Sequence, residues 1–278
     1  MFLGIDGCPA GWFVVRTASS GPITSKVYSR FSDILAETPR DSVIAVDIPI
    51  GLTKAGSRRC DDLARKALAP TRSASVFPAP LRAVLDAAAH AEASAIRREI
   101  DGKGMSIQSF AITRKVQEID LALEAFPLHQ SVHEVHPELC FTHLNGGQPM
   151  SFSKKTSAGR AERLRILTED FADSPARLVE ERVRRDVGAD DVLDALVALW
   201  SAIRISRGHA CVIAGASGSR CAGSSDGHLL LAHFACVRTR LAVAHERLPQ
   251  CTCAEQQEQS VITGVSRPST ASMSPRAA

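Results

Sequence analysis

The chain has 278 residues, of which 45% are hydrophobic but only 5% aromatic, so aliphatic side chains must fill the core of one large α/β domain or two small ones. Residues 209–278 hold six of the 33 basic and four of the 30 acidic side chains, which leaves 27 and 26 in residues 1–208. This near-neutral balance excludes the overall basic footprint of a dedicated nucleic-acid binder, so nucleic acid would have to be bound by local basic patches.

The sequence also argues against a membrane-spanning protein and against a disulfide-stabilised one. No segment reaches the ~18 uncharged apolar residues of a membrane span, and the N-terminus lacks the basic start of a signal peptide. We therefore expect a cytoplasmic protein with no membrane partner. Cys251 and Cys253 are too close in sequence for the usual zinc knuckle, so we expect neither a zinc site nor a disulfide framework. The oligomeric state is left open.

The first part of the chain predicts strands. Residues 2–5, 12–15 and 26–31 are short runs of strand-forming residues separated by turns, which predicts an antiparallel meander. A short helix is expected at 31–37. The almost continuous apolar run at 43–50 is typical of a strand buried on both faces.

The remainder predicts mainly helices. Residues 58–126 form a helical insertion, 132–135 a short strand, and 161–171 and 190–207 two further helices. The pattern predicts an α/β fold in which a mixed sheet is flanked by helices. After residue 208 there is no lysine and five of the eight cysteines occur, so we treat 209–278 as an atypical, partly disordered tail beyond a domain of residues 1–208.

Two apolar strands carry an acid where an apolar residue would pack better. These acids are Asp6, after Ile5, and Asp47, after Val46. A buried carboxylate needs a cation or hydrogen-bond donors. The alternative is that each acid caps a turn at the end of its strand.

A third acidic group opens the last helix. Asp191 and Asp194 are three residues apart and share one face of the helix. Capping explains an acid at the start of a helix, but it explains Asp194 poorly, because that residue lies within the apolar section. We expect the carboxylates of Asp6, Asp47 and at least one of this pair to lie within about 8 Å of one another, as a shared cation requires.

Glu134, within the strand at 132–135, is the fifth candidate acid and could complete the cluster. His133 and His136 could be ligands, but ordinary partly exposed histidines are the favoured interpretation. Carboxylate oxygens select Mg²⁺ or Mn²⁺ over zinc. Two such ions about 4 Å apart would suit in-line phosphodiester hydrolysis.

Basic residues are less specific, since most are simply solvated. Arg59, Lys115 and Lys155, each beside another basic residue, are the candidates for phosphate contacts. The glycines near the N-terminus are followed by a strand, which excludes a dinucleotide-binding fingerprint.

Several motifs of this chain together resemble a known family. They are Gly4–Trp12, Asp47–Leu52, Glu134–Glu138 and Asp190–Ala195. In this combination, over roughly residues 1–208, they resemble domain of unknown function 429, whose members are predicted ribonuclease H-like nucleases. The resemblance implies that fold. Asp6, Asp47, Asp191 and Asp194 are similar to the acids of Holliday-junction resolvases, and Glu134 would belong to this family's own pattern.

The leading hypothesis is a Mg²⁺- or Mn²⁺-dependent nuclease acting on DNA or RNA. Its candidate catalytic acids are Asp6, Asp47, Glu134, Asp191 and Asp194, of which all but Glu134 are candidate metal ligands. Two alternatives remain open. One is a phosphotransferase or phosphohydrolase for a small phosphorylated ligand, and the other is a non-catalytic binding module, because a fold does not determine a function.

Overall fold

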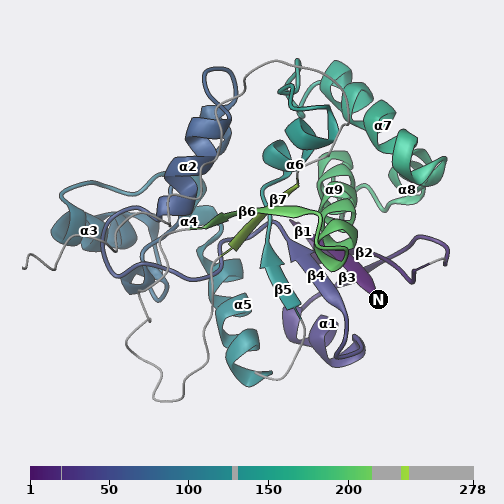
Figure 1. Cartoon of the computed structure of the whole chain (residues 1–278). Helices are drawn as coiled ribbons and strands as arrows, with labels where there is room; N and C mark the ends of the chain where they lie inside the picture. Colours follow the sequence, from purple (N-terminus) through teal and green to yellow (C-terminus); the bar gives the residue numbers. More distant parts are fainter. Residues whose placement is uncertain (20, 127–130, 215–232, 238–278) are drawn as a thin grey trace, which may run out of the picture. The chain divides into compact units, whose positions relative to one another are not determined.

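The computed structural model describes residues 1–19, 21–126, 131–214 and 233–237, which are arranged around a mixed β-sheet (Figure 1). The sheet order is β3-β2-β1-β4-β5-β7-β6. Its strands are β1 (Phe2–Cys8), β2 (Gly11–Thr17), β3 (Thr24–Tyr28), β4 (Val43–Val46), β5 (Ser131–Glu134), β6 (Ala210–Ala214) and β7 (His233–Val237).

Strand directions match the prediction. The first three strands form the expected antiparallel meander, and β4 and β5 then continue the sheet in parallel with β1. The apolar run at 43–50 is a strand only as far as Val46, because the chain bends at Asp47 and Ile48. The predicted α/β class, a mixed sheet flanked by helices, is confirmed, and the arrangement is consistent with a ribonuclease H-like sheet.

Helices cover both faces of the sheet, and each face has its own core. On one face α1 (Phe31–Glu37) and α5 (Thr113–Ala125) pack against Ile5, Ile44 and Val46. On the other face α9 (Ala189–Ser206) packs against Val15, Ala45 and Val135. Three further helices contribute to the same core: α6 (Pro137–Leu144), α7 (Ser157–Phe171) and α8 (Ser174–Glu181).

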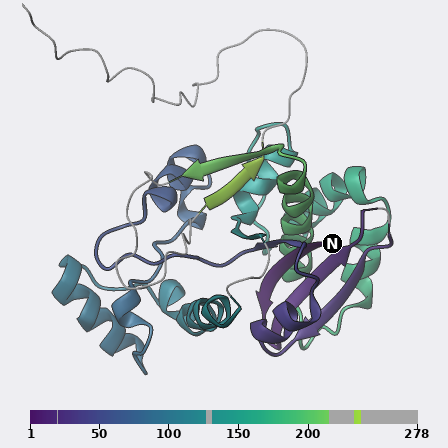
Figure 2. The same cartoon turned by 60° about the horizontal axis from the view of Figure 1, so that its bottom comes forward.

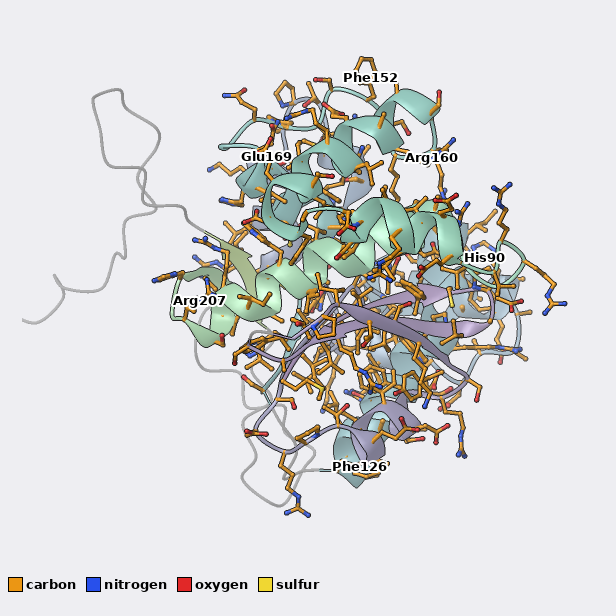
Figure 3. All side chains as sticks on the ribbon, turned by 90° about the vertical axis from the view of Figure 1, so that its right-hand side faces the viewer. His90, Phe126, Phe152, Arg160, Glu169 and Arg207 are labelled. Carbon is orange, nitrogen blue, oxygen red and sulfur yellow. The ribbon has the colours of Figure 1, made fainter. Side chains whose placement is uncertain are left out.

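Residues of the helices that cover the two faces lie on opposite sides of the sheet. Figure 3 shows Phe126, which follows α5, on the opposite side of the sheet from Arg160 and Glu169 of α7. In the same view α9, which ends near Arg207, runs directly along the sheet. Strand alternation therefore decides which helices a given strand side chain meets.

Between β4 and β5 every described element is helical, which confirms the predicted insertion. These elements are α2 (Arg59–Ala67), two 3₁₀ turns (Ser73–Ser75 and Arg82–Val84), α3 (His90–Asp101), α4 (Ile107–Ala111) and α5. Among the described residues, no helix combines the length and the apolar character that crossing a bilayer requires.

Two strands beyond residue 208 pair with the sheet. β7 runs parallel to β5, and β6 is antiparallel to β7 at the sheet edge near α2 (Figure 2). All described residues fall within the first of two compact units, Met1–Thr239. The predicted domain boundary at 208 stays a prediction, and most of the tail predicted to be partly disordered lies outside the described residues.

Candidate metal centre

Asp6 is directed to the α9 face by strand alternation and by one glycine. Leu3 and Ile5 face α1 and α5, so Gly4 and Asp6 face the other way. A Cβ at Gly4 would lie 2.1 Å from the Leu199 nitrogen, so the absence of a side chain lets the α9 backbone rest on β1. Asp6, two residues further along the same face, therefore meets the N-terminal part of α9.

Asp47 reaches the same place from the neighbouring strand. β4 is parallel to β1 with Ile5 opposite Val46, and the N–H of Asp47 donates to the carbonyl of Ile5 at 3.1 Å. Since Ala45 faces α9, Asp47 continues that face. The two acids therefore lie side by side where the parallel strands end.

Asp194 completes the group from α9. One oxygen from each of Asp6, Asp47 and Asp194 can be chosen so that all three lie within 4.8 Å of one another. The expected convergence within about 8 Å is confirmed. Asp6 is 9% exposed and Asp194 only 1%. The alternative role, capping of a turn, applies in part to Asp6, which accepts a hydrogen bond from the N–H of Gly7 at 2.7 Å.

Crowding of buried acids changes their acidity. Burial, followed by the charges of Asp47 and Asp194, raises the pKa of Asp6 well above its usual value. Burial also raises the pKa of Asp47 to about 8, with Lys154 opposing the shift. Without a further cation, the protein therefore holds these groups in an environment that disfavours their charged forms.

Asp191, the other acid of the helix pair, has a backbone partner. Its Oδ2 accepts from the N–H of Gly188 at 2.9 Å, as expected for an acid in the first turn of a helix. Burial raises its pKa, and it is one of the charges acting on Asp6. Asp191 thus lies next to the three-carboxylate group without belonging to it.

Lys154 is a site residue that the sequence interpretation did not select. It lies in the loop between α6 and α7, and its Nζ is 2.5 Å from Asp194 Oδ2. The carboxylate of Asp194, followed by those of Asp6 and Asp47, raises the pKa of Lys154. Its neighbour Lys155, which was selected, pairs with Asp190 and is 74% exposed. The only signal in the sequence was that the two lysines are adjacent.

Two buried polar atoms near the carboxylates have no hydrogen-bond partner in the described part of the chain. They are Glu138 Oε2 and His136 Nδ1. Glu138 is among the charges that raise the pKa of Asp47, while its other oxygen accepts from Arg163 at 2.6 Å. Burial lowers the pKa of His136 to about 4, and Lys154 and Asp194 also act on it. Unpaired buried acceptors need a ligand or water. The Glu138 oxygen and the three carboxylates are hard oxygen donors that fit Mg²⁺ or Mn²⁺.

Glu134 lies on the other face of the sheet. It is opposite Val46 in the parallel register and therefore faces away from Asp47. Both its oxygens accept from Arg58 at 2.8 Å, and Arg58 also binds Asp61 at 2.6 Å. Burial raises the pKa of Glu134, with Arg58 opposing the shift. Glu134 therefore belongs to a buried ion-pair network, separate from the three carboxylates.

The three basic candidates occupy different surroundings. Arg59 is exposed at the start of α2. Lys115 donates to the carbonyl of Gly11 at 2.5 Å and lies over the Trp12 ring, 4.4 Å from its centroid. Burial lowers the pKa of Lys115, and Asp6 is among the charges near it. The structure thus brings Lys115 toward the carboxylates but not Arg59.

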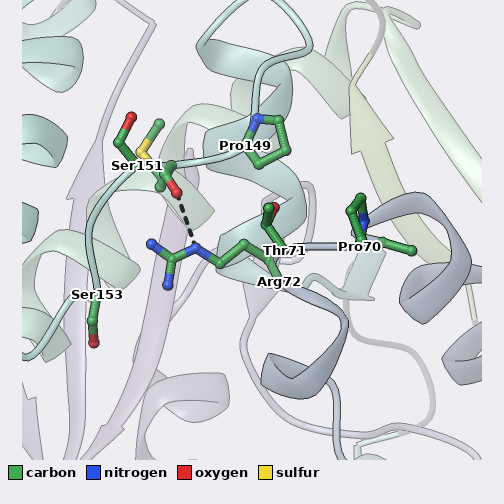
Figure 4. Close-up of a pocket in the computed structure, with 8 residues that line it drawn as sticks. Pro70, Thr71, Arg72, Pro149, Ser151 and Ser153 are labelled. Atoms are coloured by element: carbon green, nitrogen blue, oxygen red, sulfur yellow. Dashed lines mark hydrogen bonds between the residues drawn. The ribbon is translucent and has the colours of Figure 1, made fainter.

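A pocket of about 670 Å³ opens between the segments 69–72 and 149–153 (Figure 4). Arg72 crosses it, with its Nε donating to the carbonyl of Met150 at 2.9 Å, and Ser151 and Ser153 line the facing side. Lys154 directly follows Ser153 in the chain, so one loop serves both the pocket and the carboxylate group.

Comparison with protein families gave one match. The family model described as "Protein of unknown function (DUF429)" matches residues 4–217, which include all three carboxylates. Comparison with curated proteins and with solved structures found no match. The match spans more than half of the chain and agrees with the motifs found in the sequence, and the chain therefore belongs to the DUF429 family.

Proposed function

We propose that this protein is a Mg²⁺- or Mn²⁺-dependent nuclease that hydrolyses phosphodiester bonds. The observation that carries the proposal is the convergence of Asp6, Asp47 and Asp194 within 4.8 Å at the end of the sheet. Three ionised carboxylates held together in a largely buried setting repel one another, and a divalent cation between them would remove that repulsion. Asp191, in the same turn of α9, lies beside the proposed metal site and acts on Asp6 through its charge, and Glu134 acts on Asp47 in the same way.

In this proposal Asp6, Asp47 and Asp194 hold the ion and fix its position relative to the sheet. The ion would supply Lewis-acid activation of a water and stabilisation of the leaving oxygen. Lys154 keeps a positive charge beside the carboxylates. Loss of any one metal-holding carboxylate would cost orders of magnitude in rate, because the group acts as a unit.

The substrate side of the proposal rests on local basic residues. Arg59, Lys115 and Lys155 are the proposed phosphate contacts, and Arg72 in the neighbouring pocket adds a fourth. Contacts to phosphates position the nucleic-acid backbone but do not distinguish its base sequence. Substitution of Arg59 or Lys155 should therefore weaken binding and reduce its salt dependence, while leaving cleavage of bound substrate intact.

A second candidate is hydrolysis or transfer of phosphate on a small ligand. Two observations favour it: the body of the chain is close to neutral, and the pocket volume of about 670 Å³ is in the range of small-molecule sites, roughly 300–1,000 Å³. The same carboxylates would hold the ion, but the phosphate group would be presented from the pocket.

A cytoplasmic location is the last part of the proposal. Cys8, Cys60 and Cys140 are buried free thiols, which suits a reducing compartment.

The test is a cleavage assay over single-stranded, duplex, hybrid and branched nucleic acids with Mg²⁺ and Mn²⁺. We expect divalent-dependent cleavage that Asp47→Asn abolishes and Asp41→Asn, in an exposed turn, leaves unchanged. If all nucleic acids remain intact while a small phosphorylated compound turns over, the second candidate is correct. If metal binds but nothing turns over, the chain is a binding module.

A further inference from the structure

Lys154 already places one positive charge within the carboxylate group. Its Nζ is 2.5 Å from Asp194 Oδ2, and Asp6 and Asp47 are the next charges acting on it. Asp194 is 1% exposed, whereas the Lys154 side chain is 34% exposed. Lys154 therefore binds a buried carboxylate while about a third of its own side chain stays exposed.

The charge of the group sets how many divalent ions it can balance. With all four groups ionised, as a bound cation favours, three carboxylates and one ammonium together carry two negative charges, which one divalent ion neutralises. A second divalent ion would leave this largely buried group with an excess of positive charge, which is costly without partners.

The spacing of the carboxylate oxygens also fits a single bound ion. Mg²⁺ and Ca²⁺ bind oxygens at about 2.0–2.6 Å, so two ligands on opposite sides of one ion are about 4–5 Å apart. The three carboxylate oxygens lie within 4.8 Å of one another, which is the spread of ligands around a single ion.

Two unpaired polar atoms near the group would suit water molecules bound to an ion. Glu138 Oε2 and His136 Nδ1 lie buried near Asp47 and Asp194, without hydrogen-bond partners in the described residues. Glu138 is only 7% exposed. Waters on a hydrated ion would donate to such acceptors, as buried polar atoms require.

We propose that the centre binds one divalent ion, and that the Lys154 ammonium takes the position and the charge of a second one. This inference rests on the proposed function and changes its mechanism: a single ion and a lysine replace the pair of ions expected from the sequence. Lys154 is then the group that meets an anionic oxygen of the substrate beside the ion.

Lys155 provides a matched control. It is the next residue, it also pairs with an aspartate at 2.5 Å, and it is 74% exposed outside the group. A change at Lys155 removes the same charge from the same loop without touching the three carboxylates.

The experiment titrates the full chain with Mn²⁺ at neutral pH, with the number of bound ions measured by equilibrium dialysis and their coupling by electron paramagnetic resonance. We expect one uncoupled Mn²⁺ per chain in wild type, in Lys155→Met and in Lys154→Arg. Lys154→Met should bind Mn²⁺ about tenfold more tightly or better, because a neighbouring positive charge is gone.

Two exchange-coupled ions in wild type would overturn the inference but leave the proposed metal site standing. Equal affinities of Lys154→Met and Lys155→Met would also overturn it. Absence of any bound Mn²⁺ in wild type would overturn both the inference and the proposed function. If Lys154→Met does not fold, the number of ions in wild type and in Lys154→Arg decides the matter.

Discussion

Gly4 lies directly against the backbone of Leu199, with room for a hydrogen atom but not for a methyl group between β1 and α9. Gly4→Ala should therefore push the helix away from the sheet and destabilise the protein by about 1–3 kcal/mol or more, as overpacking does. Urea unfolding measures this. Gly21→Ala is the control, because its added carbon would lie 3.4 Å from the nearest atom. Equal losses at both positions would contradict the close contact.

Divalent metal should stabilise the protein. An ion that binds only the folded chain adds about 2.7 kcal/mol at a hundredfold excess over its Kd, so the melting temperature should rise with Mg²⁺ or Mn²⁺. Asp6→Asn should blunt this rise, because it removes one of the three oxygen ligands. Asp41→Asn should respond like wild type. A melting curve that millimolar metal leaves unchanged would rule out the site.

The metal-free protein should lose stability as the pH rises from about 4 to 8. Burial raises the pKa of Asp47 from an ordinary 3.8 to about 8, so the folded chain holds a proton over this range that the unfolded chain releases. The stabilisation that the protonated Asp47 provides is therefore fully present below pH 4. It is lost progressively as the pH rises to 8, with a slope of at most about 1.4 kcal/mol per pH unit.

Other acids titrate in the same range, so the measurement compares wild type with Asp47→Asn. Unfolding free energies in a chelator should diverge with rising pH, the wild type becoming less stable relative to the variant. Saturating Mg²⁺ should reduce this difference. A difference that does not depend on pH would mean that Asp47 is ionised normally.

Arg58 should be a major determinant of stability, and its neighbour Arg59 should not. Arg58→Met would leave Glu134 and Asp61 as buried carboxylates without their cation, which costs about 3–5 kcal/mol. Arg59→Met, at an exposed position, should change the unfolding free energy by less than about 0.5 kcal/mol. Chemical denaturation of the two variants distinguishes them, and similar values would contradict the network.

Glu134→Gln separates this network from the metal centre. Because Glu134 faces away from Asp47, this variant should lose stability while still binding one Mn²⁺ per chain. If Mn²⁺ binding disappears in a variant that is still folded, Glu134 is a ligand after all.

The sequence alone was sufficient to predict those site acids that interrupt apolar runs. Asp6 and Asp47 were recognisable because a carboxylate in such a run is costly, and Asp194 because capping does not explain an acid inside the apolar part of a helix. The direction of Glu134 was not accessible, because it follows from the pairing of Val46 with Glu134, and a shift of one residue in that register reverses the face.

Lys154 and the last strands were missed for different reasons. Lys154 reaches Asp194 from a loop 40 residues earlier, and no local pattern encodes such a contact. β6 and β7 lie in a segment whose unusual composition suggested a tail, and β7 meets β5 through a single registered pair, Glu134 with Phe234. Pairing over such a distance depends on tertiary contacts rather than on propensity.

The hydrogen bond from the Asp47 N–H to the Ile5 carbonyl joins the two strands that carry Asp6 and Asp47. The spacing of these two proposed metal ligands is therefore fixed by the strand pairing of the sheet. Insertions in the loop before β3 would leave that spacing unchanged. The loss of one residue within β4 would instead turn position 47 toward α5 and bring its neighbour to the α9 face. Length variation among natural relatives should therefore be absent from β1 and β4 and concentrated in the connecting segments.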